Sequence, residues 1–138
     1  MKRSADQPRD TLAHMIRVGC FAILGMTVVV GLVIDLGHLA VVHTELSRAV
    51  KVAATAGAQD LHDGQTKAKK TAIAVAAQRF GVGYMNTTSR DFHVRVLSEA
   101  ESPVVAVHGN AYVPTTFLRY VGLEVVPVDA NATAAPEL

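Results

Sequence analysis

Cysteine and tryptophan are the scarcest residues in this chain of 138 residues, which has one cysteine, Cys20, and no tryptophan. A single cysteine excludes an internal disulfide and the zinc sites that need two or four thiolates. Charge of one sign is also scarce, because 13 basic and 12 acidic residues leave a net charge of +1. That balance gives no basic surface for a nucleic-acid backbone, so we expect no nucleic-acid partner. The length leaves room for one domain.

Catalytic motifs are missing as well. The chain has no HExxH, no GxSxG and no glycine-rich phosphate loop. His93 and His108 would lie roughly opposite each other in a hairpin, but two ligands do not make a metal site. The sequence therefore predicts a protein that is not an enzyme, with no catalytic, cofactor-binding or metal-binding residues. The two histidines keep open one alternative, a membrane-anchored periplasmic ligand-binding or sensing module.

Hydrophobicity is what the chain has in excess, with half of its residues hydrophobic and a mean hydropathy of +0.28. Residues 18–34 contain no charged residue, and apolar residues of 36–42 can extend this run. Its length is at the lower edge of the roughly 17 to 25 residues that cross a bilayer. The remaining chain is too short to cover such a helix on every side, so we predict a membrane-spanning helix. A cleaved signal peptide is the alternative, but its apolar region is usually only about 7 to 15 residues long.

Basic residues near the apolar run predict its orientation, because they favour the cytoplasmic side. Four precede it and two follow soon after: Lys2, Arg3, Arg9 and Arg17, then Arg48 and Lys51. We therefore expect residues 1–17 to be a cytoplasmic tail, and the chain beyond about residue 42 to be extracytoplasmic.

The helical pattern continues past the apolar run, with no proline from residue 35 to residue 59. Apolar or small residues recur at spacings of three and four at Leu36, Leu39, His43, Leu46, Val50, Ala53 and Gly57. A neighbouring polar stripe carries Asp35, His38, Glu45, Arg48, Lys51 and Thr55. The sequence thus predicts one helix over 18–59, consisting of a membrane span and an extracytoplasmic extension.

Two features of this helix suggest packing. Ala49, Ala53 and Gly57 stand four apart, which lets another helix approach closely, either from the same domain or from another subunit. Asp35 lies at the membrane boundary, where an unpaired carboxylate is costly. It is interpreted either as an interfacial residue near His38 or as a charge that pairs with another subunit.

We expect residues 60–138 to form a small extracytoplasmic α+β domain. After a turn at LHDGQ, in which Asp63 or Thr66 can cap the next helix, that helix runs from about Thr66 to Phe80.

Three strands are expected in the same domain. Residues 91–98 and 103–113 alternate as the two strands of an antiparallel hairpin, and a third strand starts at Leu123 after a short helix or turn. The predicted fold is therefore α+β, a long N-terminal transmembrane helix continuing into a domain with a second helix and an antiparallel sheet of about three strands.

Two stretches resemble a known family. IDLGHLAVVHTELSRAVKVAATAGAQDL, after the apolar run, resembles the start of TadE/TadG-like proteins of the Flp (Tad) pilus-assembly system. VVAVHGNAYVPTTFLRYVGLEVVPVDANATA is similar to the strand, Val-Pro-Thr-x-Phe-Leu turn, glycine and strand of the same proteins. The first motif is carried by Asp35, Leu36, Gly37, Leu46, Ala53, Ala54, Ala56, Gly57 and Ala58, and the second by Pro114, Thr115, Phe117, Leu118 and Gly122.

The resemblance implies a pilin-like, single-pass protein of a bacterial inner membrane, with its N-terminus cytoplasmic and its C-terminal domain extracytoplasmic. It implies a minor pseudopilin or assembly factor of an adhesive pilus, without catalysis, and leaves open incorporation into the surface filament. The expected partners are membrane lipid, other pilus or secretion-system subunits and, in a homo-oligomer, further copies of the chain. The expected helix-packing or assembly residues are Asp35, Gly37, Leu46, Ala49, Ala53 and Gly57, with an outer-domain motif at Pro114, Thr115, Phe117, Leu118 and Gly122.

Overall fold

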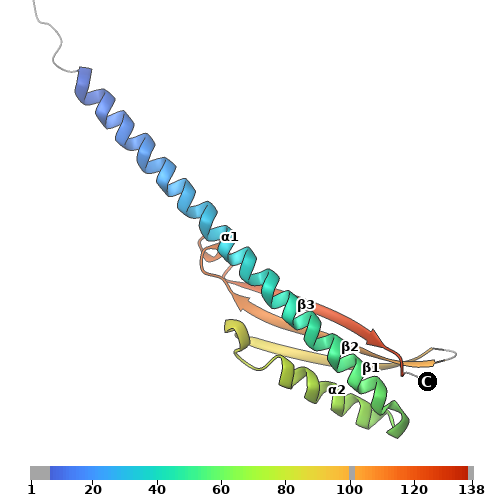
Figure 1. The fold of residues 1–138 in the computed structure, drawn as a ribbon. Coiled ribbons are helices and arrows are strands. Elements are labelled where there is room, and N and C mark those ends of the chain that lie inside the picture. The colour runs from blue at the N-terminus through green and yellow to red at the C-terminus, as the bar shows by residue number, and fades with distance from the viewer. Residues whose placement is uncertain (1–6, 100–101, 137–138) are drawn as a thin grey trace, which may run out of the picture.

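The computed structural model describes residues 7–99 and 102–136, so the predicted tail residues Lys2 and Arg3 lie outside the described residues. The elements follow in the order α1 (Gln7–Gln59), η1 (Asp60–Asp63), α2 (Gln65–Arg79), η2 (Tyr84–Asn86), β1 (Ser89–Glu99), β2 (Ser102–Pro114), η3 (Leu118–Val121) and β3 (Val125–Ala134). Figure 1 shows α1 as one continuous rod, whose N-terminal part stands free and whose C-terminal part packs with α2 on the sheet. The α+β fold predicted from the sequence is confirmed.

Helix α1 ends at Gln59, as the sequence predicts, but it begins at Gln7. The earlier start is possible because residues 9–17 contain no glycine or proline, and Pro8 lies in the first turn, where its missing N–H costs nothing. The helix therefore precedes the apolar run by more than two turns.

The buried face of α1 differs from the predicted apolar stripe. Leu36 and His43 are exposed, whereas Asp35, which was assigned to the polar stripe, is buried. The hydrophobic residues that α1 contributes to the core are Val42, Leu46, Ala49, Val50, Ala53, Ala54 and Ala58. The predicted stripe is therefore wrong near Leu36, where it begins. Apolar side chains surround the helix there, so hydropathy alone cannot show which side meets the domain.

Helix α2 packs closely on α1 because both helices present small residues at the contact. Its buried residues Ala68, Ala72 and Ala76 face α1 and the sheet. A Cβ atom added at Gly57 would lie 3.0 Å from the Cβ of Ala72 and 3.2 Å from Cγ1 of Val105. The small residues near the end of α1 thus serve packing within this chain.

The start of α2 corrects the predicted cap. Gly64, with φ of 114°, occupies the N-cap position, and neither Asp63 nor Thr66 makes a capping hydrogen bond. Lys67 instead donates a hydrogen bond to Asp63, which holds the pKa of Asp63 below its usual value and raises the pKa of Lys67. Both side chains are largely exposed, so this pair contributes little to stability.

The sheet has the order β1-β2-β3, and both pairs of strands are antiparallel. One face of the central strand carries buried Val105, Val107 and Val113 against the helices. Helix α1 crosses this face closely, since a Cβ at Gly109 would lie 2.9 Å from Cγ1 of Val50. The predicted hairpin is confirmed, and β3 begins at Val125, two residues after the predicted start.

The close contact at Gly57 yields a test of the core. We expect Gly57→Leu to lower the free energy of unfolding by about 1–3 kcal/mol, because the added side chain overfills the contact with α2 and β2. Thermal unfolding of the full chain in detergent micelles, followed by circular dichroism, measures the effect. Gly37→Leu is the control, because nothing lies within 4 Å of a Cβ at Gly37. Equal losses in the two variants would contradict this account of the core.

Candidate functional site: the junction between helix and domain

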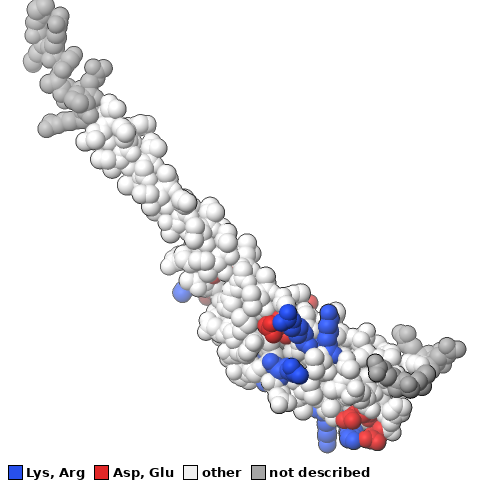
Figure 2. All heavy atoms as spheres, viewed as in Figure 1, with Lys and Arg blue, Asp and Glu red and all other residues white. Residues whose placement is uncertain are grey.

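The N-terminal part of α1 is apolar and uncovered. It is long and apolar enough to cross a membrane. Its exposed large hydrophobic residues include Val18, Phe21, Ile23, Leu24, Met26, Val28, Val29 and Val30. Figure 2 shows charged side chains gathered over the domain, while the visible face of the described helix beyond it is uncharged. This part of α1 is therefore suited to a surrounding of lipid or of other apolar helices.

Asp35 is the first residue after the apolar run, and it bonds to the domain of the same chain. The backbone N–H groups of Phe117 and Leu118 donate to its Oδ2 at 2.7 Å each, and the N–H of Thr116 donates to Oδ1 at 3.1 Å. Asp35 is only 4% exposed. Three N–H donors stabilise its ionised form and oppose the cost of burying it. The sequence interprets Asp35 as an interfacial residue near His38 or as a charge that pairs with another subunit, and it does not predict these N–H donors from the same chain.

These N–H groups belong to the loop that joins β2 to β3. The loop is closed at its base by Thr115, whose N–H donates to the carbonyl of Glu124 at 3.0 Å and whose hydroxyl donates to the carbonyl of Leu123. Gly122, with φ of 89°, adopts the left-handed conformation that ends η3. Asp35 satisfies donors at the start of η3, as an N-cap side chain would, but from 81 to 83 residues away in sequence.

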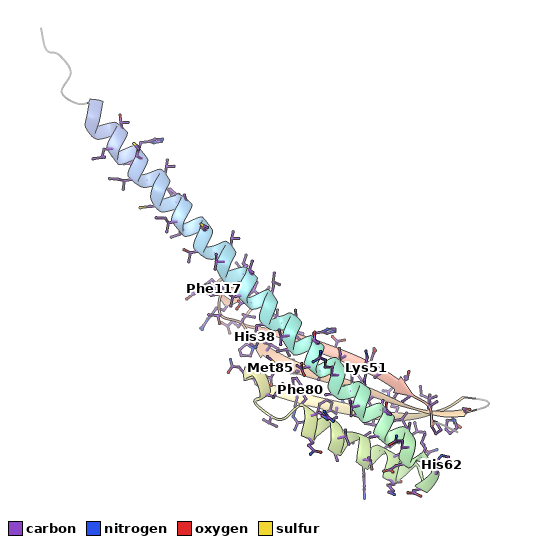
Figure 3. All side chains as sticks on the ribbon, viewed as in Figure 1. His38, Lys51, His62, Phe80, Met85 and Phe117 are labelled. Atoms are coloured by element: carbon purple, nitrogen blue, oxygen red, sulfur yellow. The ribbon has the colours of Figure 1, made fainter. Side chains whose placement is uncertain are left out.

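The ring of Phe117 lies directly on α1 at Gly31. A Cβ atom added to Gly31 would lie 2.3 Å from Cγ and Cδ1 of this ring, so no larger residue fits without displacing it. Figure 3 shows Phe117 beside α1, where the helix leaves the domain. Gly31 is not among the residues predicted from the sequence, although its position one turn before Asp35 places it on the same face of the helix.

A second loop holds α1 one turn after Asp35. Nε2 of His38 lies 3.0 Å from the carbonyl oxygen of Met85, in a hydrogen bond that joins the helix to η2. Met85 and Asn86 have φ of 50° and 61°, a backbone conformation that is uncommon for residues other than glycine. The domain thus contacts two successive turns of α1, through Phe117 and Asp35 and then through His38.

The other helix-packing candidates divide by location. Leu46, Ala49, Ala53 and Gly57 are buried against this chain's own helix and sheet, whereas Gly37 is exposed with open space around it. A partner helix could therefore reach Gly37 directly, but not the four buried positions.

The outer-domain motif forms one unit. Pro114, Thr115, Phe117, Leu118 and Gly122 all lie in or beside the loop that Asp35 holds. The two stretches that carry the resemblance, far apart in sequence, thus meet at the junction between α1 and the domain.

The histidine pair lies on the other face of the sheet. His93 and His108 are direct partners in the register of β1 and β2. Oδ2 of Asp91 lies 3.0 Å from Nε2 of His93. Within residues 7–99 and 102–136, no group of three or more His, Cys, Asp or Glu residues could hold a metal ion.

Comparison with known families decides the class of this helix. Residues 16–60 match the family model described as putative Flp pilus-assembly TadE/G-like. The chain carries a TadE/G-like domain. The resemblance read from the first motif is confirmed, while the β2–β3 loop lies outside the match. No curated protein and no solved structure matches the chain.

The TadE/G-like domain of residues 16–60 covers nearly all of α1 beyond its first turns. It includes Gly31, Asp35 and His38, at which α1 contacts loops of the outer domain. The TadE/G-like helix therefore carries both the apolar segment and the attachment points for the rest of the chain.

The Asp35 interaction can be tested by proteolysis. We expect Asp35→Asn to speed trypsin cleavage after the exposed Arg119 several-fold, because its amide group can no longer accept all three hydrogen bonds as a charged carboxylate does. Mass spectrometry of timed digests of the full chain in micelles gives the rate. Glu45→Gln is the matched control, since Glu45 on the same helix forms an ion pair with exposed Arg48. Equal cleavage rates in both variants would remove Asp35 as the residue that holds the loop.

The contact between Gly31 and Phe117 calls for a double-mutant cycle. We expect Gly31→Ala to expose the loop to trypsin in the native background but to have a much smaller effect beside Phe117→Ala, which removes the clashing ring. The coupling should be about 0.5–3 kcal/mol, as is usual for residues in contact. Additive effects of the two substitutions would show that the ring does not pack on Gly31.

Proposed function

We propose that this protein is a membrane-anchored minor pseudopilin or assembly factor of a Flp/Tad-type pilus, acting through helix packing and protein–protein contacts. One observation carries the proposal: a single TadE/G-like helix leaves its apolar half uncovered and uses its other half as a wall of a small domain. The uncovered half supplies an anchor or a packing surface, and the domain supplies contacts outside the membrane.

The proposed location is a bacterial inner membrane crossed once. Residues 1–17 would be cytoplasmic and the domain extracytoplasmic, because basic residues are concentrated before the apolar run. Asp35 attaches the domain at the end of the run farther from the N-terminus, so the domain and residues 1–17 would lie on opposite sides of the membrane.

Contact with another subunit would use the face of α1 that the domain leaves open. Gly37, Ala40, Val41 and Thr44 are exposed there, and the space around Gly37 would let a second helix come close. In this proposal the buried residues Leu46 to Gly57 act indirectly, by fixing the domain to the helix.

A genetic experiment tests the proposal. In a strain that lacks this gene, we expect the native gene to restore surface filaments and adhesion, and Gly37→Leu to restore several-fold fewer filaments at an equal amount of protein in the membrane. The added side chain has open space within the chain, so its effect would arise between subunits. Electron microscopy counts the filaments, and immunoblots of membranes measure the protein.

Ala74→Leu provides the control, because Ala74 is exposed on α2, away from the proposed contact. Normal filaments in the strain lacking the gene would refute a role in pilus assembly. Equal filament numbers with Gly37→Leu and Ala74→Leu would instead remove the Gly37 face as the contact.

A further inference from the structure

We infer that the loop between β2 and β3 is a second membrane contact, which inserts its apolar side chains among phospholipids beside α1. The loop comprises residues 115–124, and its occupant would be the phospholipid acyl chains of the leaflet on the side of the domain. The inference requires that α1 span the bilayer, but it does not depend on a role in pilus assembly.

The loop exposes more apolar surface than a turn in water normally does. Tyr120 is 84% exposed, Val121 is 69% exposed and Leu123 is 50% exposed. These residues follow one another closely around η3, so they form one patch and not scattered positions. Clustered exposed apolar residues indicate a surface that meets a partner or a membrane.

An apolar groove connects this patch with the membrane helix. Phe117 and Tyr120 line it from the loop, and α1 lines it with Cys20, Ile23, Leu24, Thr27 and Val28. All five helix residues belong to the uncharged run of residues 18–34. The groove is therefore continuous with the lipid-facing surface of α1 and has the chemistry to receive an acyl chain.

The depth of the loop follows from its attachment. Phe117 rests on Gly31, which lies inside the apolar run, about 6 Å before Asp35 along the helix axis. The seventeen residues from 18 to 34 rise by about 25 Å, less than the bilayer core of about 30 Å. If the run is centred in the bilayer, the core extends past Ile34 and reaches the loop. Asp35 prevents the loop from withdrawing, because it holds three of its N–H groups.

The side chains of the loop suit contact with phospholipid. Tyr120 has an apolar ring for the acyl chains and a hydroxyl that can form a hydrogen bond. The loop has two charged residues. Arg119 is exposed in the same turn as Tyr120, and its guanidinium can bind a lipid phosphate, whereas Glu124 lies at the base of the loop, where its carbonyl accepts the N–H of Thr115. An apolar patch with one exposed cation therefore favours phospholipid, whereas a helix from a second copy would offer no phosphate for Arg119.

The absence of tryptophan allows a direct experiment. Tyr120→Trp places a single indole on the patch, at a position exposed enough to tolerate the change. The full chain is reconstituted at high lipid-to-protein ratio in phosphatidylethanolamine and phosphatidylglycerol vesicles whose acyl chains are brominated. We expect blue-shifted emission and loss of most of the fluorescence through quenching by the brominated acyl chains.

Leu97→Trp serves as the matched control. Leu97 is 41% exposed and pairs with Val104 near the end of the hairpin away from the loop. We expect the indole at position 97 to emit as in water and to escape quenching.

Two results would overturn the inference. Emission typical of water without quenching at position 120 would show that the loop stays clear of the bilayer. A blue shift that arises only at low lipid-to-protein ratio, without quenching by brominated lipid, would assign the patch to a second copy of the chain.

Discussion

The hydrogen bonds from three consecutive backbone N–H groups to the carboxylate of Asp35 fix the rest of the structure in place. They join the end of an apolar segment to a loop more than 80 residues later in the chain. A carboxylate buried in this position is stable only when it is well solvated by donors, and the N–H groups of η3 provide them. These N–H groups also need an acceptor. The bonds therefore remove two costs, that of an unpaired carboxylate on the helix and that of unpaired N–H groups in the loop.

The remaining contacts depend on close approach. Glycines at positions 31, 57 and 109 each leave room for a neighbour, namely the Phe117 ring, helix α2 and helix α1 itself. Alanines line most of the helix contact between them. A domain with so few large side chains obtains its packing from short distances between backbones, which a single added methyl group disturbs.

Local patterns predicted much of the fold. Alternation in the hairpin anticipated that His93 and His108 lie opposite each other, and helical spacing anticipated the end of α1 at Gln59. The same spacing failed around Asp35, because a segment that is apolar all round has no preferred side. The partner of Asp35 could not be predicted either, since backbone N–H groups are present at nearly every residue and leave no mark in the sequence. The need for glycine at position 31 likewise depends on a ring from a distant loop.

The uninterrupted course of α1 has a mechanical consequence. The helix passes through the junction without a break. The domain contacts it on two successive turns, from Gly31 to His38. Such a junction has neither a hinge nor freedom to slide. Where α1 crosses a bilayer, a change in bilayer thickness is met by tilting of the helix. The sheet must then tilt with the helix. The angle between the sheet and the plane of the membrane is therefore set by the thickness of the membrane.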